Sequence, residues 1–196
     1  MSLSSLVSKV KNCRVLSIDP ASHSLAWSVL DISENKITVV DYGKINLAST
    51  PEMSKKFTII KQELPAIVSN YKPDACVIEQ SVFIQNFQSS RIISYIIGFT
   101  WGILDDYCKN VTDVNPLSWK SGIGYKNVSK KEVALIEKEF GKKGIQQRLS
   151  NERKQRVKDI LDKRIDNFSS EGVDSDITDA IGIGMWYGIT HGFRTV

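Results

Sequence analysis

Four acidic residues stand beside apolar segments whose burial the sequence predicts, and carboxylates in such places are suited to holding metal ions. Asp19 and Glu79 each follow a short apolar run that is typical of a buried strand. Asp176 and Asp179 begin a long apolar segment, and their spacing of three places both on one helical face. Carboxylates that converge repel one another unless cations lie between them. The pattern therefore predicts a divalent-metal site built from these four residues.

The chemistry that such a site supports is phosphodiester hydrolysis. Carboxylate oxygens suit Mg²⁺, with Mn²⁺ as a substitute, and four of them can hold two ions in one active site. Two ions about 3.5–4 Å apart can activate a water and stabilise the departing 3′ oxygen, so no protein nucleophile is needed.

Each carboxylate also has a purely structural reading. Asp176 alone is more typical of a helix cap, and Asp19 before Pro20 is compatible with a simple strand end. A structural reading is harder to maintain for Asp179, because the helical segment that follows it must be buried. We expect the four together to be functional.

The elements that must position these residues follow an α/β order. Three strands joined by short connections predict an antiparallel meander, at 14–19, 25–31 and 37–45. Apolar spacing then predicts a helix over 52–70, broken at Pro65, before a buried strand that ends at Glu79 and lies parallel to the first.

The second half of the chain predicts one further strand among helices. The expected elements are a helix over about 88–107, a strand at 111–114, a polar loop over 115–128, a helix from a capping box at Ser129 and Glu132 to Gly141, an amphipathic helix over about 150–168, and a final helix from about Asp176. This order predicts a mixed five-stranded sheet, three antiparallel strands and then two parallel ones, flanked by helices. Residues 1–196 are expected to form one domain.

Composition places the chain among soluble globular proteins. Of its 196 residues, 41% are hydrophobic and 24% are charged, which is ordinary for that class. No apolar run approaches the roughly 20 residues of a membrane span, and the first ten residues do not resemble a secretory signal. The spacing of the three cysteines, Cys13, Cys76 and Cys108, is not that of a metal site, and we expect their thiols to be reduced. We therefore expect a cytoplasmic protein that does not bind membranes.

The positive charge of the chain is concentrated in one stretch. Residues 109–164 carry 15 Lys or Arg against 7 Asp or Glu, whereas the whole chain has a net charge of only +4. A basic stretch beside an acidic cluster suits an enzyme that holds phosphate near bound metal. A solvated helical surface is the alternative reading of this stretch.

Several motifs, in order along residues 13–190, resemble the RuvC family of Holliday junction resolvases. The segment IDPAS at 18–22 is similar to the family's opening motif, and VIEQ at 77–80, with Asn86 after it, is similar to its second motif. The segment DITDA at 176–180 resembles its Asp-x-x-Asp-Ala helix. The loop and basic positions between them correspond to Asn115-Pro116, Lys120, Gly122, Gly124 and Lys130.

The resemblance implies an RNase H-like fold, a homodimer, and symmetric nicking of four-way and other branched DNA junctions. The catalytic residues would be Asp19, Glu79, Asp176, Asp179 and Lys120, with the four acids as metal ligands. Residues expected to contact DNA are Phe83, Phe87, Trp119, Lys120, Lys126, Lys130 and Lys131. In its compact size and its divergence from bacterial members, the chain resembles the phage and viral branch of the family. This resemblance implies the host cytoplasm as the location.

The chain departs from the family pattern in three places. Ala21 replaces the usual glycine, and the aromatic residue that opens the junction falls by strict spacing at Val82, with Phe83 next to it and Phe87 close by. An additional basic helical segment is expected at about 145–168. These departures bear on which substrate the protein prefers more than on the cleavage reaction itself.

The apolar helix over about 89–107 predicts how two copies would meet. Its apolar residues are spread around the helix and exceed what one sheet contact should bury. We expect a homodimer that uses the exposed side of this helix, with Phe83 and Phe87 near the two-fold axis. The alternative is a helix enclosed within one monomer.

Three other functions compete with junction cleavage. One is a different RNase H-like nuclease, which would cut RNA–DNA hybrids or a ribosomal RNA precursor. Another is a non-catalytic nucleic-acid-binding protein of the same fold, which the intact set of four carboxylates disfavours. A sugar-kinase or actin-like ATPase shares the opening pattern, but 196 residues are too few for its two lobes.

Overall fold

The computed structural model describes residues 12–34, 36–47, 52–81 and 87–191. The strands are β1 (Cys13–Pro20), β2 (Ser24–Ser33), β3 (Lys36–Asn46), β4 (Ala75–Glu79) and β5 (Val111–Val114). The helices are α1 (Met53–Tyr71), α2 (Phe87–Tyr107), α3 (Pro116–Gly122), α4 (Lys130–Arg164) and α5 (Ser175–Thr190). None of these helices combines the length and the apolar character that a membrane crossing requires.

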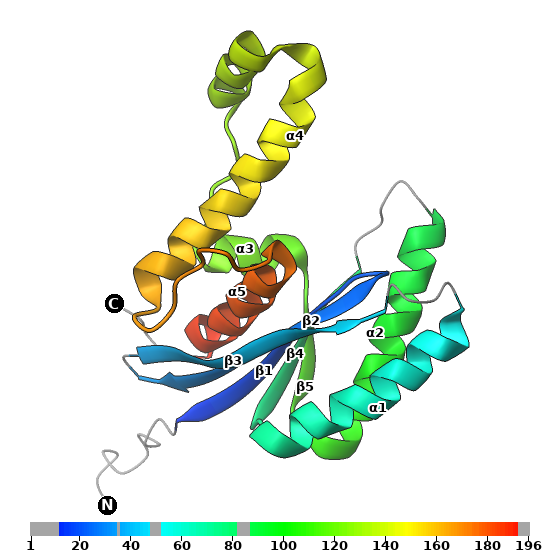
Figure 1. Ribbon diagram of the computed structural model, residues 1–196. Helices are drawn as coiled ribbons and strands as arrows, with labels where there is room; N and C mark the ends of the chain where they lie inside the picture. The colour runs from blue at the N-terminus through cyan, green and yellow to red at the C-terminus, as the bar shows by residue number, and fades with distance from the viewer. Residues whose placement is uncertain (1–11, 35, 48–51, 82–86, 192–196) are drawn as a thin grey trace, which may run out of the picture.

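The predicted mixed sheet is confirmed. The five strands lie in the order β3-β2-β1-β4-β5. The first three pair antiparallel, β4 pairs parallel with β1, and β5 pairs parallel with β4. Figure 1 shows α1 and α2 on one face of the sheet, and α3, α5 and the lower part of α4 on the other.

Two apolar cores form because side chains alternate between the two faces of each strand. On β1, Leu16 and Ile18 belong to the core beneath α1 and α2, whereas Val15 belongs to the core beneath α5. The same alternation places Cys76 and Ile78 of β4 in the first core. The residues of opposite parity on both strands therefore face α5.

Helix α5 lies against the sheet at a distance that only glycine permits. A Cβ atom at Gly184 would stand 2.5 Å from Leu30 Cδ1 and 2.7 Å from Ser17 Oγ. Beneath the helix, the buried hydroxyls of Ser17 and Ser28 hydrogen-bond each other at 2.7 Å. This close approach fixes the start of α5 above the carboxyl ends of β1 and β4.

Pro65 and the loop after β5 differ from the sequence predictions. Helix α1 continues through Pro65, since the buried Ile60, Leu64 and Val68 anchor it to the sheet on both sides of the proline. The predicted loop over 115–128 contains the helix α3, because Asn115 caps its first turn with a hydrogen bond from Leu117 N (2.9 Å).

Helix α4 consists of the two predicted helices, joined without a loop. The capping box at its start is confirmed, and so is the stop at Gly141, whose φ of 71° and ψ of 170° are not helical and form a kink between the two parts. The second part begins directly after this kink rather than near residue 150. The helix ends at Arg164, so the predicted extension to residue 168 is wrong. In Figure 1, α4 projects well beyond the sheet, and only its C-terminal part packs on the body of the protein.

Candidate active site

Asp19 and Glu79 lie at the same end of the sheet and point to the same face. They directly follow Ile18 and Ile78, which are register partners on the parallel strands β1 and β4. Ile18 and Ile78 face α1 and α2, so the next residue on each strand faces α5. Strand pairing alone therefore brings these two carboxylates together.

The start of α5 adds the other two acidic residues. The helix is capped by Asp174, whose side chain accepts a hydrogen bond from Asp176 N (2.8 Å). Asp176 is therefore not the cap residue, and the structural reading of its carboxylate does not apply. Asp179 lies one turn further along the partly buried start of the helix.

The pKa values of two of these carboxyl groups show that the set converges. Burial raises the pKa of Asp19 well above its ordinary value, and the charges of Glu79, Asp179 and Asp176 raise it further. Burial also raises the pKa of Asp179 to about 6, against the opposing effect of Lys120. A proton, or a metal ion in its place, therefore stabilises this cluster.

Three side chains from other elements hold three of these carboxylates in place. Trp119 Nε1 donates to Glu79 Oε1 at 2.6 Å, and Lys120 Nζ lies 3.4 Å from Asp179 Oδ2. On β3, Lys44 Nζ lies 2.7 Å from Asp176 Oδ2 and 2.7 Å from Asp174 Oδ1. Two cations therefore already pair with the acidic residues of α5.

Trp119 does not have the position that the sequence predicted. We expected it to contact DNA, but its side chain is wholly buried in the core beneath α5 and cannot stack on a base. The contact is so close that a Cβ atom at Gly182 would stand 2.6 Å from its ring. The sequence signal was Asn115-Pro116, a typical helix start, which would have placed Trp119 on the inner face of a helix.

No sequence pattern indicated Lys44. It stands on a strand among residues of mixed character, and its partners lie about 130 positions further along the chain. Only the packing of β3 beside α5 reveals the contact.

The donor set suits a hard divalent cation, although no cage is preformed. All four acidic side chains offer oxygen ligands, and the raised pKa values of Asp19 and Asp179 show an excess of negative charge. Within the described ranges, no three Asp, Glu, His or Cys side chains are arranged to bind a metal ion as they stand. Metal binding would therefore require Asp176 and Asp179 to exchange their lysine partners for metal.

The other residues predicted to contact DNA are three lysines and two phenylalanines. Lys126, Lys130 and Lys131 are exposed on the segment from the α3–α4 connection into the first turn of α4. Phe83 lies outside the described residues. Phe87 is the first residue of α2, and its side chain is outside the described part of the structure.

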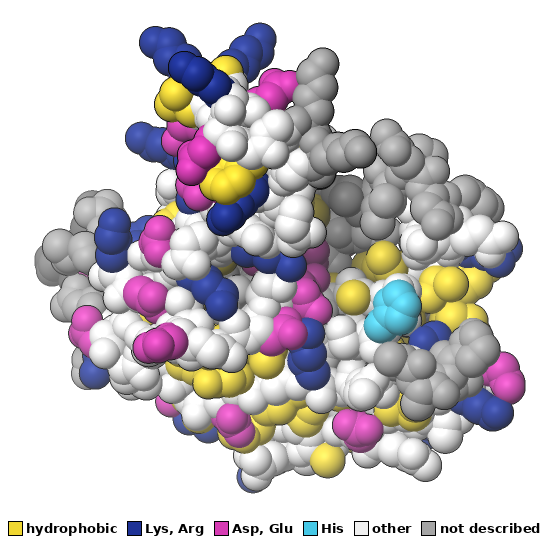
Figure 2. All heavy atoms as spheres, turned by 45° about the horizontal axis from the view of Figure 1, so that its top comes forward, with side chains coloured by type: hydrophobic (Ala, Val, Ile, Leu, Met, Phe, Trp, Pro, Cys, Tyr) yellow, Lys and Arg dark blue, Asp and Glu magenta, His cyan; other side chains and the backbone are white. Residues whose placement is uncertain are grey.

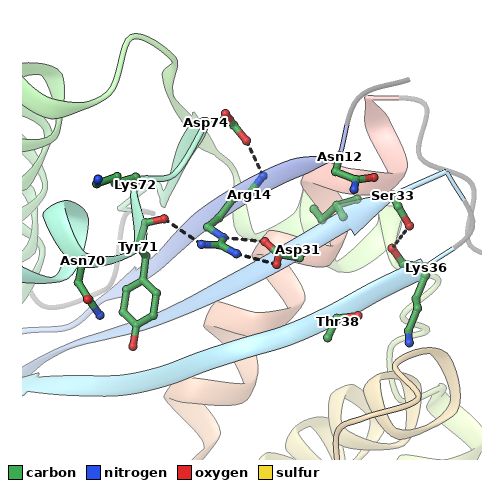
Figure 3. A pocket seen from close by; sticks show the side chains of 11 residues that line it. Asn12, Arg14, Asp31, Ser33, Lys36, Thr38, Asn70, Tyr71, Lys72 and Asp74 are labelled. Atoms are coloured by element: carbon green, nitrogen blue, oxygen red, sulfur yellow. Dashed lines mark hydrogen bonds and ion pairs between the residues drawn. The ribbon is translucent and has the colours of Figure 1, made fainter. Parts of the chain in front are cut away.

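A separate hollow of about 620 Å³ lies at the other end of the sheet. Figure 3 shows that the ion pair between Arg14 and Asp31 crosses it (2.7 Å). Arg14 is five residues before Asp19 on β1, or roughly 16 Å along the strand. This hollow therefore takes no part in the carboxylate centre.

The raised pKa of Asp179 predicts that its charge destabilises the metal-free protein. Because the pKa in the folded state is about 6, the folded protein binds more protons than the unfolded chain between about pH 4 and 6, and stability falls as the pH rises through that window. We expect Asp179→Asn to raise the melting temperature in EDTA at pH 7, and the gain to vanish near pH 4. The exposed Asp166→Asn is the control, and a lower melting temperature for Asp179→Asn at pH 7 would contradict the assignment.

The hydrogen bond from Trp119 predicts an effect on metal affinity. Trp119→Phe keeps an aromatic ring in the core but removes the donor to Glu79, so we expect Mn²⁺ to bind about 10–100-fold more weakly in a calorimetric titration. Trp186→Phe is the matched control, because Trp186 packs against the same core without a described contact to a carboxylate. Equal Mn²⁺ affinities for the two variants would show that the indole only fills space.

Comparison with known proteins gives one family. A family model described as Crossover junction endodeoxyribonuclease RuvC matches residues 15–142. The RuvC of Finegoldia magna is 31% identical over 123 residues, which cover 61% of this chain and 74% of the relative. The RuvC of Ruminiclostridium cellulolyticum is 22% identical over 178 residues, covering 90% and 92%.

The fold is also that of solved RuvC structures. Thermus thermophilus RuvC in complex with Holliday junction substrate has a TM-score of 0.63 at 15% identity, covering 91% of this chain and 94% of that one. A second Thermus thermophilus RuvC structure has a TM-score of 0.64 at 16% identity, covering 93% and 98%. The family model spans more than half of the chain, including Asp19, Glu79 and Lys120, and the chain therefore belongs to the RuvC family of crossover junction endodeoxyribonucleases.

Proposed function

We propose that this protein is a metal-dependent endonuclease that resolves four-way DNA junctions by paired symmetric nicks. The observation that carries the proposal is the convergence of Asp19, Glu79 and Asp179 at one end of the sheet, where burial and the charge of Glu79 raise the pKa values of Asp19 and Asp179. Membership of the RuvC family supports the substrate, since a RuvC of the same fold has been solved with a Holliday junction.

The four acidic residues would hold two Mg²⁺ ions, with Mn²⁺ as a substitute. When bound, such ions activate the attacking water and stabilise the departing 3′ oxygen. Lys120 lies beside Asp179 and is free to turn its ammonium group to the scissile phosphate once metal neutralises that carboxylate. There it would stabilise the charge that develops in the transition state.

The remaining assignments concern DNA contact and domain organisation. Lys126, Lys130 and Lys131 are exposed near the same end of the protein and would bind phosphates. Phe83 and Phe87 would stand near the centre of the junction. We assign residues 1–196 to one nuclease domain, in which the helical segment 145–168 is an addition to the family's pattern.

Neutralising the carboxylates tests the proposed chemistry. Asp19→Asn, Glu79→Gln or Asp179→Asn should each reduce cleavage of a labelled four-way junction by at least about 1,000-fold with Mg²⁺, because the metal ligands are lost. Junction binding should persist, since phosphates are held by the basic segment. Duplex and RNA–DNA hybrid substrates serve as controls, and cleavage of the hybrid in preference to the junction would favour a different nuclease.

The exposed side of α2 is the proposed dimer contact. Tyr95 and Tyr107 are 52% and 51% exposed, and Gly98 and Gly102 between them have open space on their outer side. A junction has two strands to cut, so two active sites related by a two-fold axis are required.

Light scattering of the metal-free protein tests this assembly. The native chain should have twice the 22.0 kDa monomer mass, and Tyr95→Arg should shift it to the monomer by placing a charge in the contact. Leu135→Arg, at an exposed leucine on α4, should remain a dimer. A native protein that is monomeric with and without junction DNA, yet makes paired nicks, would refute the model.

A further inference from the structure

A groove between α3 and α4 opens directly onto the carboxylate centre. Its volume is about 440 Å³, and the residues that line it include Leu117, Lys120, Tyr125, Arg153, Lys154 and Asp179. We call it the α3–α4 groove. Lys120 and Asp179 belong to both the groove and the candidate active site. A ligand bound along the groove would therefore extend into the active site.

The charge of the groove suits an anion. Lys120, Arg153 and Lys154 give it three positive charges against the single carboxylate of Asp179. Within the part of the chain that the structure describes, no ion pair joins Arg153 or Lys154 to an acidic residue, and both side chains are exposed. The charge of Lys154 contributes, after that of Lys44, to lowering the pKa of Asp174. In Figure 2, Lys and Arg side chains gather at the projecting upper part of the molecule, with acidic side chains among them and below them.

The basic wall of the groove is held rigidly. Arg156 donates to the carbonyl oxygens of Lys126 (3.0 Å) and Asn127 (3.2 Å) and pairs with Glu132 (2.6 Å). One residue further along, Val157 is buried in the core beneath α5. Arg153 and Lys154 stand one turn before Val157, on the helix face that looks into the groove.

The opposite wall adds apolar surface beside Lys120. Leu117, on α3, is 77% exposed although it is a large apolar residue, and Tyr125 lies beyond the end of the same helix. The groove thus has cations on both walls, Lys120 on α3 and Arg153 and Lys154 on α4, with exposed apolar surface at Leu117. This combination matches a nucleic-acid strand, which offers phosphates to cations and sugars and bases to apolar side chains.

We infer that the α3–α4 groove holds the DNA strand on one side of the cleaved bond. Arg153 and Lys154 bind its phosphates, and Leu117 contacts its sugars or bases. The additional helical segment thereby becomes part of the substrate-binding surface. This inference rests on the proposed function, because it needs a DNA strand in the active site.

The first experiment measures how the affinity for junction DNA depends on salt. We expect Arg153→Ala/Lys154→Ala to bind at least about tenfold more weakly than the native protein, and the slope of log K against log [salt] to become shallower by roughly 1.8 for two lost phosphate contacts. The control is Lys61→Ala/Lys163→Ala, which removes the same charge. Lys61 is exposed on α1, and Lys163 is exposed on α4 about two and a half turns beyond Lys154.

The second experiment locates the contact on the DNA. Neutral methylphosphonates are placed one at a time in the cut strand on both sides of the cleavage site. For the native protein and the control variant, a methylphosphonate at one or two positions on one side of the cleavage site should weaken binding. At those same positions, the methylphosphonate should not weaken the binding of Arg153→Ala/Lys154→Ala any further, because the cations that contact these phosphates are already absent.

The outcomes separate the two proposals. If the groove variant and the control have the same affinity, salt slope and methylphosphonate profile, the groove does not hold the strand, and the proposed function stands as long as the native protein cuts junctions. If the native protein neither binds nor cuts junction DNA, the proposed function fails and the inference fails with it.

Discussion

The repulsion between carboxylates that packing places together is the constraint on which the rest of the site depends. Asp19 and Glu79 are adjacent because β1 and β4 pair in parallel register, and Asp179 approaches them because α5 lies close to the sheet. Burial makes this arrangement costly for charged groups. The surrounding fold must therefore supply stability that the site itself removes, and Gly184 contributes by allowing α5 to approach β1 and β2.

The donors around the carboxylates give the metal-free protein a defined site. A neutral indole holds Glu79, and two ammonium groups hold the acidic residues of α5. The two kinds of donor differ in what they permit. Trp119 is buried in the core and keeps Glu79 oriented, whereas Lys44 and Lys120 lie on longer, partly exposed side chains that can yield to a metal ion or move to a phosphate.

Helix α4 divides its charges between structure and surface. Arg156 and Lys158 are occupied by backbone carbonyls and, for Arg156, by Glu132 and Glu152, so they fasten the helix to the body. Their neighbours Arg153 and Lys154 extend into the α3–α4 groove instead. Arg153 and Arg156 are three positions apart, and Lys154 and Lys158 are four apart, so each pair lies on one side of the helix. Their different positions along the helix axis therefore decide which neighbours they meet.

The succession of strands and helices, the mixed sheet, the capping box at Ser129 and the placing of Asp19 and Glu79 at strand ends could be predicted from the sequence, because they depend on local periodicity, turn signals and cap motifs. Tertiary structure decided what depends on distant contacts. It buried Trp119 against α5, assigned the helix cap to Asp174 and brought Lys44 to Asp176, 132 positions away. Such pairings leave no periodic signal, because they arise only when the sheet and the helices pack together.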